Sequence, residues 1–247
     1  MIKLVLIRHG QSVWNAKKLF MGWTDVGLTD LGVEEAKNAG KLLKEAGFKF
    51  DIGFTSYLER ATRTLDLALG EMGREDLEVR KSWKLNEKSY GALQGLSKVE
   101  MTELCGDDTV HPWRRSYDVR PPIIDDWDPR HPKNDPLYAD VPTQELPATE
   151  SLKDTVERFL EYWSEEIVPE LKEGSEVVIS AHGNSLRALV MHLDQMAEDE
   201  IPKLNIPTGI PLVYELDEDL KPIKHYYLGD AEAAKAAAEA VKNQAQA

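Results

Sequence analysis

Short apolar runs alternate along the chain with longer stretches of helical periodicity. The first run, Leu4-Val5-Leu6-Ile7, is continuous and is followed closely by a glycine, as expected of a buried strand. Runs of the same kind, rich in β-branched and aromatic residues, predict six strands: Ile2–Ile7, Ile52–Thr55, Leu77–Ser82, Glu176–Ala181, Leu212–Leu216 and Ile223–Tyr227.

Helices are predicted between these strands. Thr29–Ala46 has apolar residues at helical spacing, and Gly47 follows where the helix should end. A second helix is predicted from about Leu58 to Leu69, and a third opens at Ser151 with Asp154 in a capping-box arrangement. Strands that alternate with helices predict an α/β three-layer sandwich, with a mostly parallel central sheet flanked by helices.

The segment from about 87 to 150 breaks this rhythm. It holds most of the 13 prolines, with tryptophan, tyrosine and arginine interspersed. Long irregular stretches inside a domain are usually functional lids or disordered linkers, and the aromatic residues argue against disorder. We expect a single domain over 1–247, an ordered but irregular insertion over the active site, and a mobile, weakly packed helical tail from about 230 to 247.

Composition and charge narrow the classes of partner. The chain has 247 residues, of which 42% are hydrophobic and 30% charged, a balance typical of globular proteins. Its formal net charge of −14 argues against nucleic acids and anionic membranes, which bind basic surfaces. An anionic substrate would need a local basic cluster, since long-range repulsion is screened beyond roughly 8 Å at physiological salt.

Cysteine content and hydropathy predict a cytoplasmic protein. Cys105 is the single cysteine, so no disulfide forms within the chain, and no motif around it suggests a nucleophile. The N-terminal apolar run is too short for a signal peptide, and no segment approaches the ~18 apolar residues of a membrane span.

Two predicted strands end in a histidine followed by glycine. Arg8-His9-Gly10 follows the first strand, and His182-Gly183 follows the strand at 176–181. Ligands of open α/β sheets bind at the carboxyl ends of strands, where these histidines would meet. A lone histidine more often caps a strand. A pair beside an arginine instead suggests a nucleophile and a guanidinium fork for phosphoryl oxygens, with helix Ser185–Leu193 offering N–H groups to the anion.

With these motifs the chain resembles the histidine phosphatase superfamily. More narrowly, it resembles the cofactor-dependent (2,3-bisphosphoglycerate-dependent) phosphoglycerate mutases, from residue 2 to residue 228 and into the tail. Simple phosphatases of the superfamily usually lack the long middle segment. The narrower resemblance rests on Phe20-Met21-Gly22-Trp23, Thr55-Ser56 with Arg60-Ala61, Leu85-Asn86-Glu87-Lys88-Ser89-Tyr90-Gly91, Leu93-Gln94-Gly95-Leu96, Trp113-Arg114-Arg115, Pro147 with Glu150-Ser151, and Asn205-Ile206-Pro207-Thr208-Gly209.

The resemblance implies a role for each site residue. His9 would be the nucleophile that carries phosphate as phosphohistidine, Glu87 the acid/base for the substrate hydroxyl, and His182 a stabiliser of the phosphoryl group. Arg8 and Arg60 would neutralise the phosphoryl oxygens. Further residues match positions that hold substrate phosphate and carboxylate: Ser12, Asn15, Met21, Gly22, Lys88, Ser89, Tyr90, Lys98, Arg114, Arg115, Gly183 and Asn184.

Two positions depart from the family pattern. Met21 stands where the family has a threonine, and so offers no hydroxyl. Glu87-Lys88-Ser89-Tyr90 stands where the family typically reads Glu-Arg-His-Tyr, which removes an imidazole beside the acid. Either change is expected to lower substrate affinity or to alter the balance of mutase and phosphatase turnover, because a lost hydrogen bond to a charged group is worth roughly 1.5–3 kcal/mol.

The expected activity is interconversion of 2-phosphoglycerate and 3-phosphoglycerate. The resemblance implies priming by 2,3-bisphosphoglycerate, phosphoglycerate as the small-molecule ligand, and a homodimer or tetramer. No metal is expected, since no histidine pair has metal-ligand spacing. Two alternatives stay open: a broad phosphomonoesterase that uses the same nucleophile, and a catalytically inactive phospho-ligand sensor or scaffold.

Overall fold

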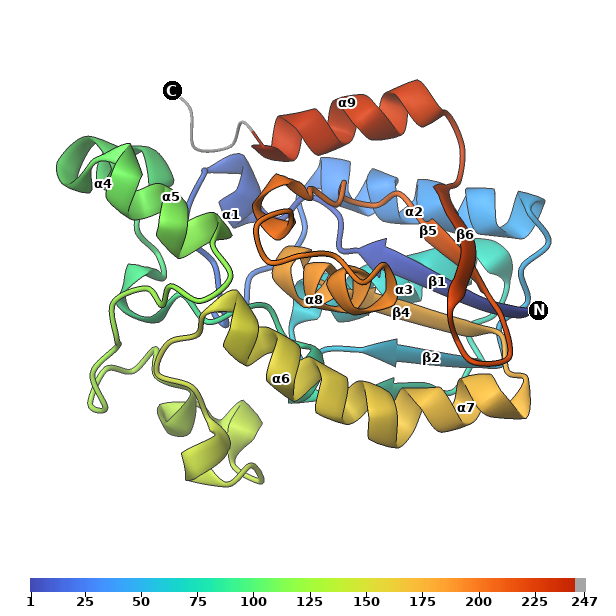
Figure 1. Ribbon diagram of the computed structural model, residues 1–247, viewed down its shortest axis with the longest axis horizontal. Coiled ribbons are helices and arrows are strands. Elements are labelled where there is room, and N and C mark those ends of the chain that lie inside the picture. Colours follow the sequence, from blue (N-terminus) through green and yellow to red (C-terminus); the bar gives the residue numbers. More distant parts are fainter. Residues whose placement is uncertain (243–247) are drawn as a thin grey trace.

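Six strands form one sheet in the order β3-β2-β4-β1-β5-β6 (Figure 1). The computed structural model describes residues 1–242. The strands are β1 Ile2–Arg8, β2 Ile52–Thr55, β3 Val79–Lys81, β4 Val177–Ala181, β5 Leu212–Leu216 and β6 Pro222–Tyr227. The first four are parallel to one another, whereas β5 runs antiparallel to β1 and to β6. The predicted α/β class with a mostly parallel sheet is therefore confirmed.

Helices cover both faces of the sheet. The α-helices are α1 Val13–Ala16, α2 Asp30–Glu45, α3 Glu59–Met72, α4 Lys98–Cys105, α5 Asp107–Arg115, α6 Leu152–Tyr162, α7 Val168–Glu173, α8 Gly183–Leu193 and α9 Ala231–Lys242. A π-helical turn, Trp163–Ile167, joins α6 to α7. Short 3₁₀ turns are Trp83–Leu85, Gly91–Leu93, Pro132–Asn134, Pro136–Tyr138, Thr143–Glu145 and Ile201–Lys203. Helix starts follow sequence chemistry: Thr29 caps α2, and Ser151 forms the predicted capping box with Asp154.

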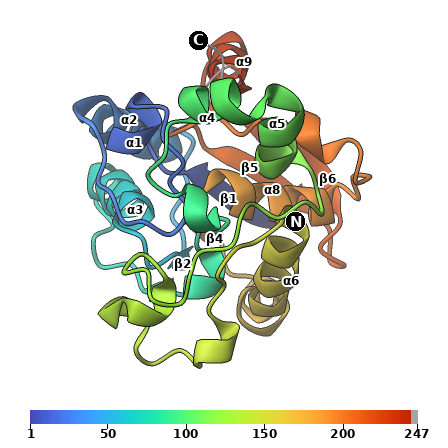
Figure 2. The same cartoon turned by 90° about the vertical axis from the view of Figure 1, so that its left-hand side faces the viewer.

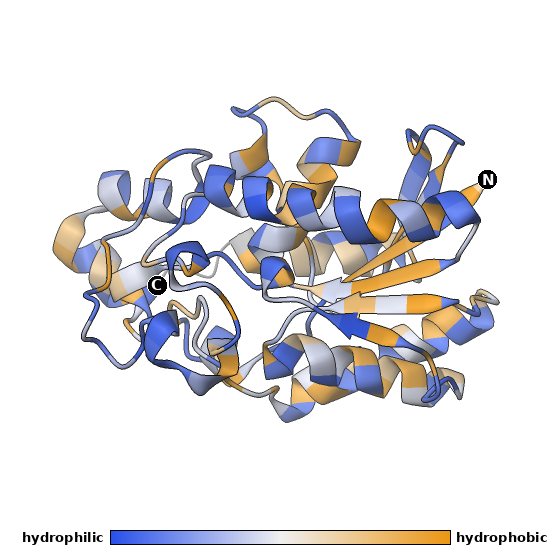
Figure 3. Ribbon diagram, turned by 90° about the horizontal axis from the view of Figure 1, so that it is seen from below, coloured by the Kyte–Doolittle hydropathy of each residue, from blue (hydrophilic) through white to orange (hydrophobic). Residues whose placement is uncertain are grey.

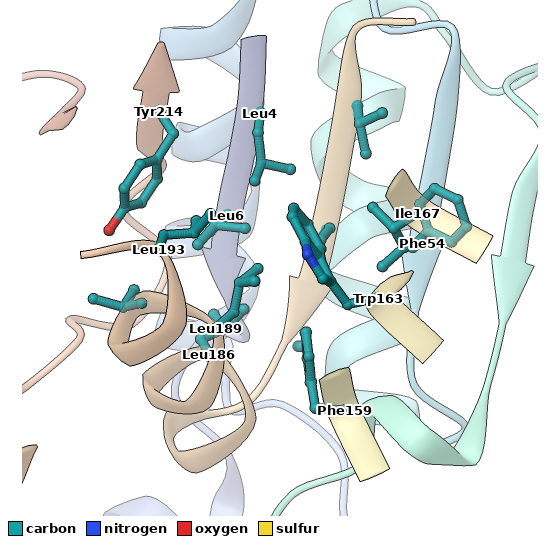
Figure 4. Close-up of a cluster of buried hydrophobic side chains, with 14 of the residues drawn as sticks. Leu4, Leu6, Phe54, Phe159, Trp163, Ile167, Leu186, Leu189, Leu193 and Tyr214 are labelled. Carbon is teal, nitrogen blue, oxygen red and sulfur yellow. The ribbon is translucent and has the colours of Figure 1, made fainter. Parts of the chain in front are cut away.

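Two hydrophobic clusters hold these layers together. On one face, strand residues such as Val5 and Ile7 pack against α2 and α3 through Leu43 and Leu65. On the other face, α6, α7 and α8 cover the sheet, and Figure 4 shows Phe159 and the leucines of α8 in this cluster. Figure 3 shows the apolar strands between two layers of largely hydrophilic helix surface. Burying both faces fixes the strand ends that carry the histidines.

Two predicted elements need correction. The insertion is not irregular throughout, because α4 and α5 form within it; Pro112 inside α5 obscures the helical pattern. Helix α8 begins at Gly183, two residues before the predicted start. The tail forms the predicted helix as α9, in which Ala234 and Val241 are buried while most of the other described residues are exposed; residues 243–247 lie outside the described residues. Within residues 1–242, no helix has the length and apolar character needed to cross a membrane.

A contact between two glycines places the loop after β1. Gly10 and Gly32, on the first turn of α2, approach so closely that a Cβ on either would lie under 3.0 Å from backbone atoms of the other segment. The Gly10 N–H also donates to Thr64 Oγ1 on α3 at 3.1 Å. Helices α2 and α3 therefore fix the backbone that follows His9.

Substitution of Gly32 by Ala should destabilise the protein by about 1–3 kcal/mol, because the new Cβ meets the Gln11 carbonyl rather than a side chain that can move aside. Urea unfolding measures the change. Gly70→Ala is the matched control: Gly70 lies exposed in α3 with only Glu75 Oε1 at 4.0 Å from the added Cβ, and should stabilise by about 0.5–1 kcal/mol. Equal effects of the two substitutions would contradict the close-contact argument.

Candidate active site

The sheet brings His9 and His182 together, as predicted. β1 and β4 are neighbours and parallel, and the His9 N–H donates to the Ala181 carbonyl at 3.0 Å. The two imidazole centroids are 5.1 Å apart, with planes inclined by 58°. Both side chains are fully buried.

Hydrogen bonds determine the tautomer of His9. Its Nδ1 lies 2.8 Å from the Gly10 carbonyl oxygen, and since a carbonyl only accepts, Nδ1 carries the hydrogen. In the neutral ring Nε2 then holds a lone pair, and Nε2 is buried with no hydrogen-bond partner among the described residues. His182 is held differently: its Nε2 lies 2.7 Å from Ser56 Oγ, and its Nδ1 is the atom left unpartnered there.

Both imidazoles are neutral at pH 7. Burial lowers the pKa of His9 well below its usual value of 6.5, and the Arg60 and Arg8 guanidinium groups lower it further. Burial likewise lowers the pKa of His182, with Arg60 and His9 as the next contributors. A neutral Nε2 with a free lone pair is the form of histidine that acts as a nucleophile.

Arg8 and Gly183, the chain neighbours of these histidines, line a pocket with an empty volume of about 610 Å³ including its mouth, whereas His9 and His182 are buried and are not among the described lining residues. Most predicted binding residues line it. The described lining consists of Arg8, Asn15, Met21, Gly22, Glu87, Tyr90, Lys98, Arg114, Arg115, Gly183, Asn184, Arg187, Asn205, Ile206 and Val241. Figure 2 looks toward this end of the molecule, where α4 and α5 lie between α9 and α8.

The pocket is strongly cationic. Five of its lining residues are arginine or lysine, whereas Glu87 is the one acidic residue among the described lining. Burial lowers the pKa of Lys98 to about 7, and Arg114 and Arg8 lower it further. Burial also lowers the pKa of Arg115 to about 9, with Arg187 and Arg114 contributing. Such mutual perturbation is expected where like charges are gathered to bind an anion.

Glu87 is fixed at the start of α8. Its Oε1 accepts hydrogen bonds from the Asn184 N–H at 3.1 Å and from the Lys88 N–H at 2.7 Å. The Glu87 carbonyl accepts from Trp23 Nε1 at 2.6 Å and from Arg158 Nη2 at 3.0 Å. The start of α8 is predicted to offer backbone N–H groups to an anion. One of these groups, the Asn184 N–H, already binds the Glu87 carboxylate.

Arg60 is buried behind the pocket and does not line it. Its guanidinium donates to the Gly22 carbonyl at 2.7 Å and to the Thr24 carbonyl at 3.0 Å, while its Nε has no partner within residues 1–242. Burial lowers its pKa to about 10. Gly22 adopts a left-handed φ of 55°, and a Cβ there would collide with Gln94 Oε1, so glycine is required in this loop. Arg60 therefore shapes the loop.

The Ser12 hydroxyl and the Met21 thioether contact each other. They therefore do not present two hydroxyls to the pocket, as a serine and a threonine at these positions would. Ser12 Oγ donates to Met21 Sδ at 3.1 Å and lies 3.0 Å from Asn15 Oδ1. Met21 and Asn15 line the pocket, whereas Ser12 is fully buried beneath them.

Lys88 and Ser89 do not line the pocket in the described structure. Lys88 Nζ donates to the Trp113 carbonyl at 2.7 Å and lies 4.7 Å from the centre of the Tyr90 ring. Burial lowers its pKa to about 7, and Arg187 contributes. The Ser89 N–H donates to Glu150 Oε2 at 2.8 Å. Both positions thus connect the Glu87 segment to neighbouring elements.

Sequence reasoning missed several lining residues. Arg187 does carry a sequence signal, because it is a charged residue within the apolar pattern of α8. In the structure its side chain is 3% exposed. Asn205 and Ile206 were noted only as parts of a motif. Val241 belongs to α9. A short Ala-rich helix carries no sequence signal that shows which part of the protein it packs against. Within residues 1–242, no group of three or more His, Cys, Asp or Glu is placed to hold a metal ion.

Comparisons with known proteins agree with this geometry. The model of the histidine phosphatase superfamily (branch 1) matches residues 4–129 and 124–228. The 2,3-bisphosphoglycerate-dependent phosphoglycerate mutases of Borreliella burgdorferi (strain ZS7) and Borreliella afzelii (strain PKo) are each 57% identical over 244 residues, covering 99% of this chain and 98% of theirs. The crystal structure of a phosphoglycerate mutase from Bacillus anthracis str. Sterne has the same fold, with a TM-score of 0.65, 22% identity and 95% of each chain covered.

The buried histidines should make stability depend on pH. Because their folded-state pKa values are depressed, the unfolded chain binds more protons below about pH 6.5, and stability falls as pH drops. Each histidine contributes up to about 1.4 kcal/mol per pH unit. His9→Asn retains a donor for the Gly10 carbonyl but removes one contribution, so urea unfolding between pH 7 and 5 should show a shallower slope than wild type.

The control for this measurement is His111→Asn. His111 is exposed on α5, so its replacement should leave the slope unchanged. A wild-type slope in His9→Asn would show that the imidazole is not held neutral by its surroundings.

Proposed function

The chain belongs to the histidine phosphatase superfamily and, within it, to the 2,3-bisphosphoglycerate-dependent phosphoglycerate mutases, and we propose on that premise that it interconverts 2-phosphoglycerate and 3-phosphoglycerate through a phosphohistidine. The observation that carries the mechanism is the neutral, unpartnered Nε2 of His9, a fully buried residue that directly follows Arg8 of the cationic pocket lining. Phosphoryl transfer requires mainly in-line positioning and charge neutralisation, which this arrangement offers.

His9 is the nucleophile in this proposal. Its Nε2 lone pair forms the bond to phosphorus, and the Nδ1–H stays on the Gly10 carbonyl, which holds the ring in one orientation. His182 stabilises the phosphoryl oxygens through Nδ1, the unpartnered atom of its ring among the described residues. The Arg8 guanidinium, anchored through Nη1 to the Ile206 carbonyl at 2.7 Å, neutralises charge on the same oxygens.

Glu87 is the acid/base. When His9 gives its phosphoryl group to a substrate hydroxyl, Glu87 accepts the hydroxyl proton, and it returns a proton in the reverse transfer. The two N–H donors on Oε1 fix the carboxylate without a salt bridge, which leaves Oε2 the freer oxygen for this exchange.

The remaining cations suit the second anionic group of the substrate. Lys98, Arg114 and Arg115 come from α4 and α5 rather than from the strands that precede the histidines, and bind the substrate carboxylate or its second phosphate in this proposal. The buried polar atoms without partners in the described structure include Arg8 Nε, Arg60 Nε and Arg187 Nε. Arg8 and Arg187 line the pocket, and their unpaired Nε–H groups fit a multiply charged phosphate ester such as 2,3-bisphosphoglycerate, which supplies the phosphoryl group that primes His9.

A homodimer or tetramer and a cytoplasmic location, expected from the family resemblance, complete the proposal. No metal ion takes part in it. The neighbouring arginines carry out the charge neutralisation that a metal supplies in other phosphoryl-transfer sites, and the neutral His182 adds a hydrogen bond.

The wild-type protein should convert 3-phosphoglycerate to 2-phosphoglycerate in the presence of chelator, at a rate that rises with catalytic amounts of 2,3-bisphosphoglycerate. His9→Ala should abolish both turnover and phosphohistidine labelling, because the lone pair is lost. To measure turnover, the protein is treated with chelator and the chelator is removed by dialysis. Enolase and the metal that it needs are then added for a coupled assay. Phosphate release without isomerisation would favour the alternative of a phosphomonoesterase. Binding of the ligand without formation of covalent phosphate would favour the alternative of a catalytically inactive sensor.

Met21→Thr tests the first departure from the family pattern. Threonine would place a hydroxyl where the thioether now accepts from Ser12, and should raise kcat/KM for 3-phosphoglycerate about tenfold, the lower end expected for a hydrogen bond to a charged group. Met21→Leu supplies no hydroxyl and separates this effect from loss of the sulfur. Similar kinetics for the threonine and leucine variants would exclude a role for the hydroxyl.

A further inference from the structure

Arg187 occupies a position between two parts of the pocket. It lies on α8, is 3% exposed, and lines the pocket beside Asn184. Burial lowers its pKa to about 10, so it remains a cation at pH 7. A buried arginine on a helix that is otherwise mostly apolar needs specific hydrogen-bond partners, because an unpaired buried charge is costly.

One side of the guanidinium contacts Asn184. Arg187 Nη1 donates to Asn184 Oδ1 at 2.8 Å, and Asn184 Nδ2 donates to the Tyr90 hydroxyl at 3.3 Å. A side-chain amide has an acceptor on one side and donors on the other, so a cation on Oδ1 decides that the NH₂ group faces Tyr90. The flipped amide would place its NH₂ against the guanidinium, which has no acceptor to offer.

The other side of the guanidinium contacts two backbone carbonyls. Arg187 Nη2 donates to the Ile201 carbonyl at 2.6 Å and to the Arg115 carbonyl at 3.3 Å. Arg115 is the last residue of α5, and Ile201 begins a 3₁₀ turn. One side chain thus connects the helix that starts at Gly183 with the helix that carries Arg114 and Arg115.

Asn184 also contacts the proposed acid/base, because its backbone N–H donates to Glu87 Oε1. We propose that Arg187 is a positioning residue for the mutase reaction: it orients the Asn184 amide toward Tyr90 and the bound phosphate ester, and it fixes the C-terminal end of α5 relative to Glu87. The inference rests on the proposed function. Lysine could not replace it, since a single ammonium cannot span three oxygens that the planar guanidinium reaches at once.

A double-mutant cycle tests the proposal. Arg187→Met keeps most of the apolar stem of the side chain but removes its donors, and should lower kcat/KM for 3-phosphoglycerate about ten- to a hundredfold, as expected for hydrogen bonds to a charged group. In an Asn184→Ala background the same substitution should lower kcat/KM by a smaller factor, because the amide that Arg187 orients is already gone and only its contacts with the Arg115 and Ile201 carbonyls remain to be lost. Arg187→Lys should give an intermediate loss.

Two further measurements keep the outcome decisive. Titration calorimetry with 3-phosphoglycerate on the same four proteins gives the coupling even if turnover becomes too slow to measure. Arg74→Met is the matched control, because Arg74 also donates to a backbone carbonyl, that of Phe50, at 3.0 Å but far from the site residues in the fold; kcat/KM should not change.

Equal fold-losses from Arg187→Met in both backgrounds, together with a lower melting temperature, would identify Arg187 as a structural residue only and overturn the inference. Unchanged kinetics of Arg187→Met would overturn it as well. Failure of the proposed function itself is distinguishable, since wild type and Arg74→Met would then both lack mutase activity.

Discussion

Repulsion among buried cations is the constraint on which the organisation of this site depends. Arg8, Arg60 and Arg187 are each less than 10% exposed, and burial lowers the pKa of all three. The fold tolerates them because each guanidinium donates to backbone carbonyls, at Ile206, at Gly22 and Thr24, and at Ile201 and Arg115. Carbonyl dipoles solvate a cation without neutralising it, so the positive charge remains for an anionic ligand.

Burial, reinforced by the same positive field, lowers the pKa of both histidines and so determines their state. An imidazole beside Arg8 and Arg60, out of contact with water, is disfavoured as a cation, and this is why His9 keeps its Nε2 lone pair. The field that binds a phosphoryl group thus also prepares the nucleophile. Glu87 is held by N–H groups rather than by an arginine, so the one acidic residue in the described lining is not consumed by an ion pair.

The sequence predicts those parts of the site that follow directly from strand patterns. His9 and His182 directly follow the ends of two largely apolar strands, β1 and β4, and parallel neighbours necessarily bring such strand ends together. The chain does not reveal α5 in the same way, because Pro112 interrupts its pattern, or the placement of Val241, which depends on tertiary packing of a distant tail. Lys88 resembles another pocket cation in sequence, yet its ammonium group bonds the Trp113 carbonyl. Where a long side chain points is decided by neighbours that local sequence does not specify.

The net charge of −14 and the cationic pocket act over different distances. Surface carboxylates repel an anionic ligand from afar, but salt screens that repulsion beyond roughly 8 Å. The pocket cations are largely buried, so their attraction to a bound anion is screened far less than the surface repulsion. Selection for phosphate esters therefore depends on the few ångströms around Arg8, Lys98 and Arg115, and the acidic exterior does not weaken the site.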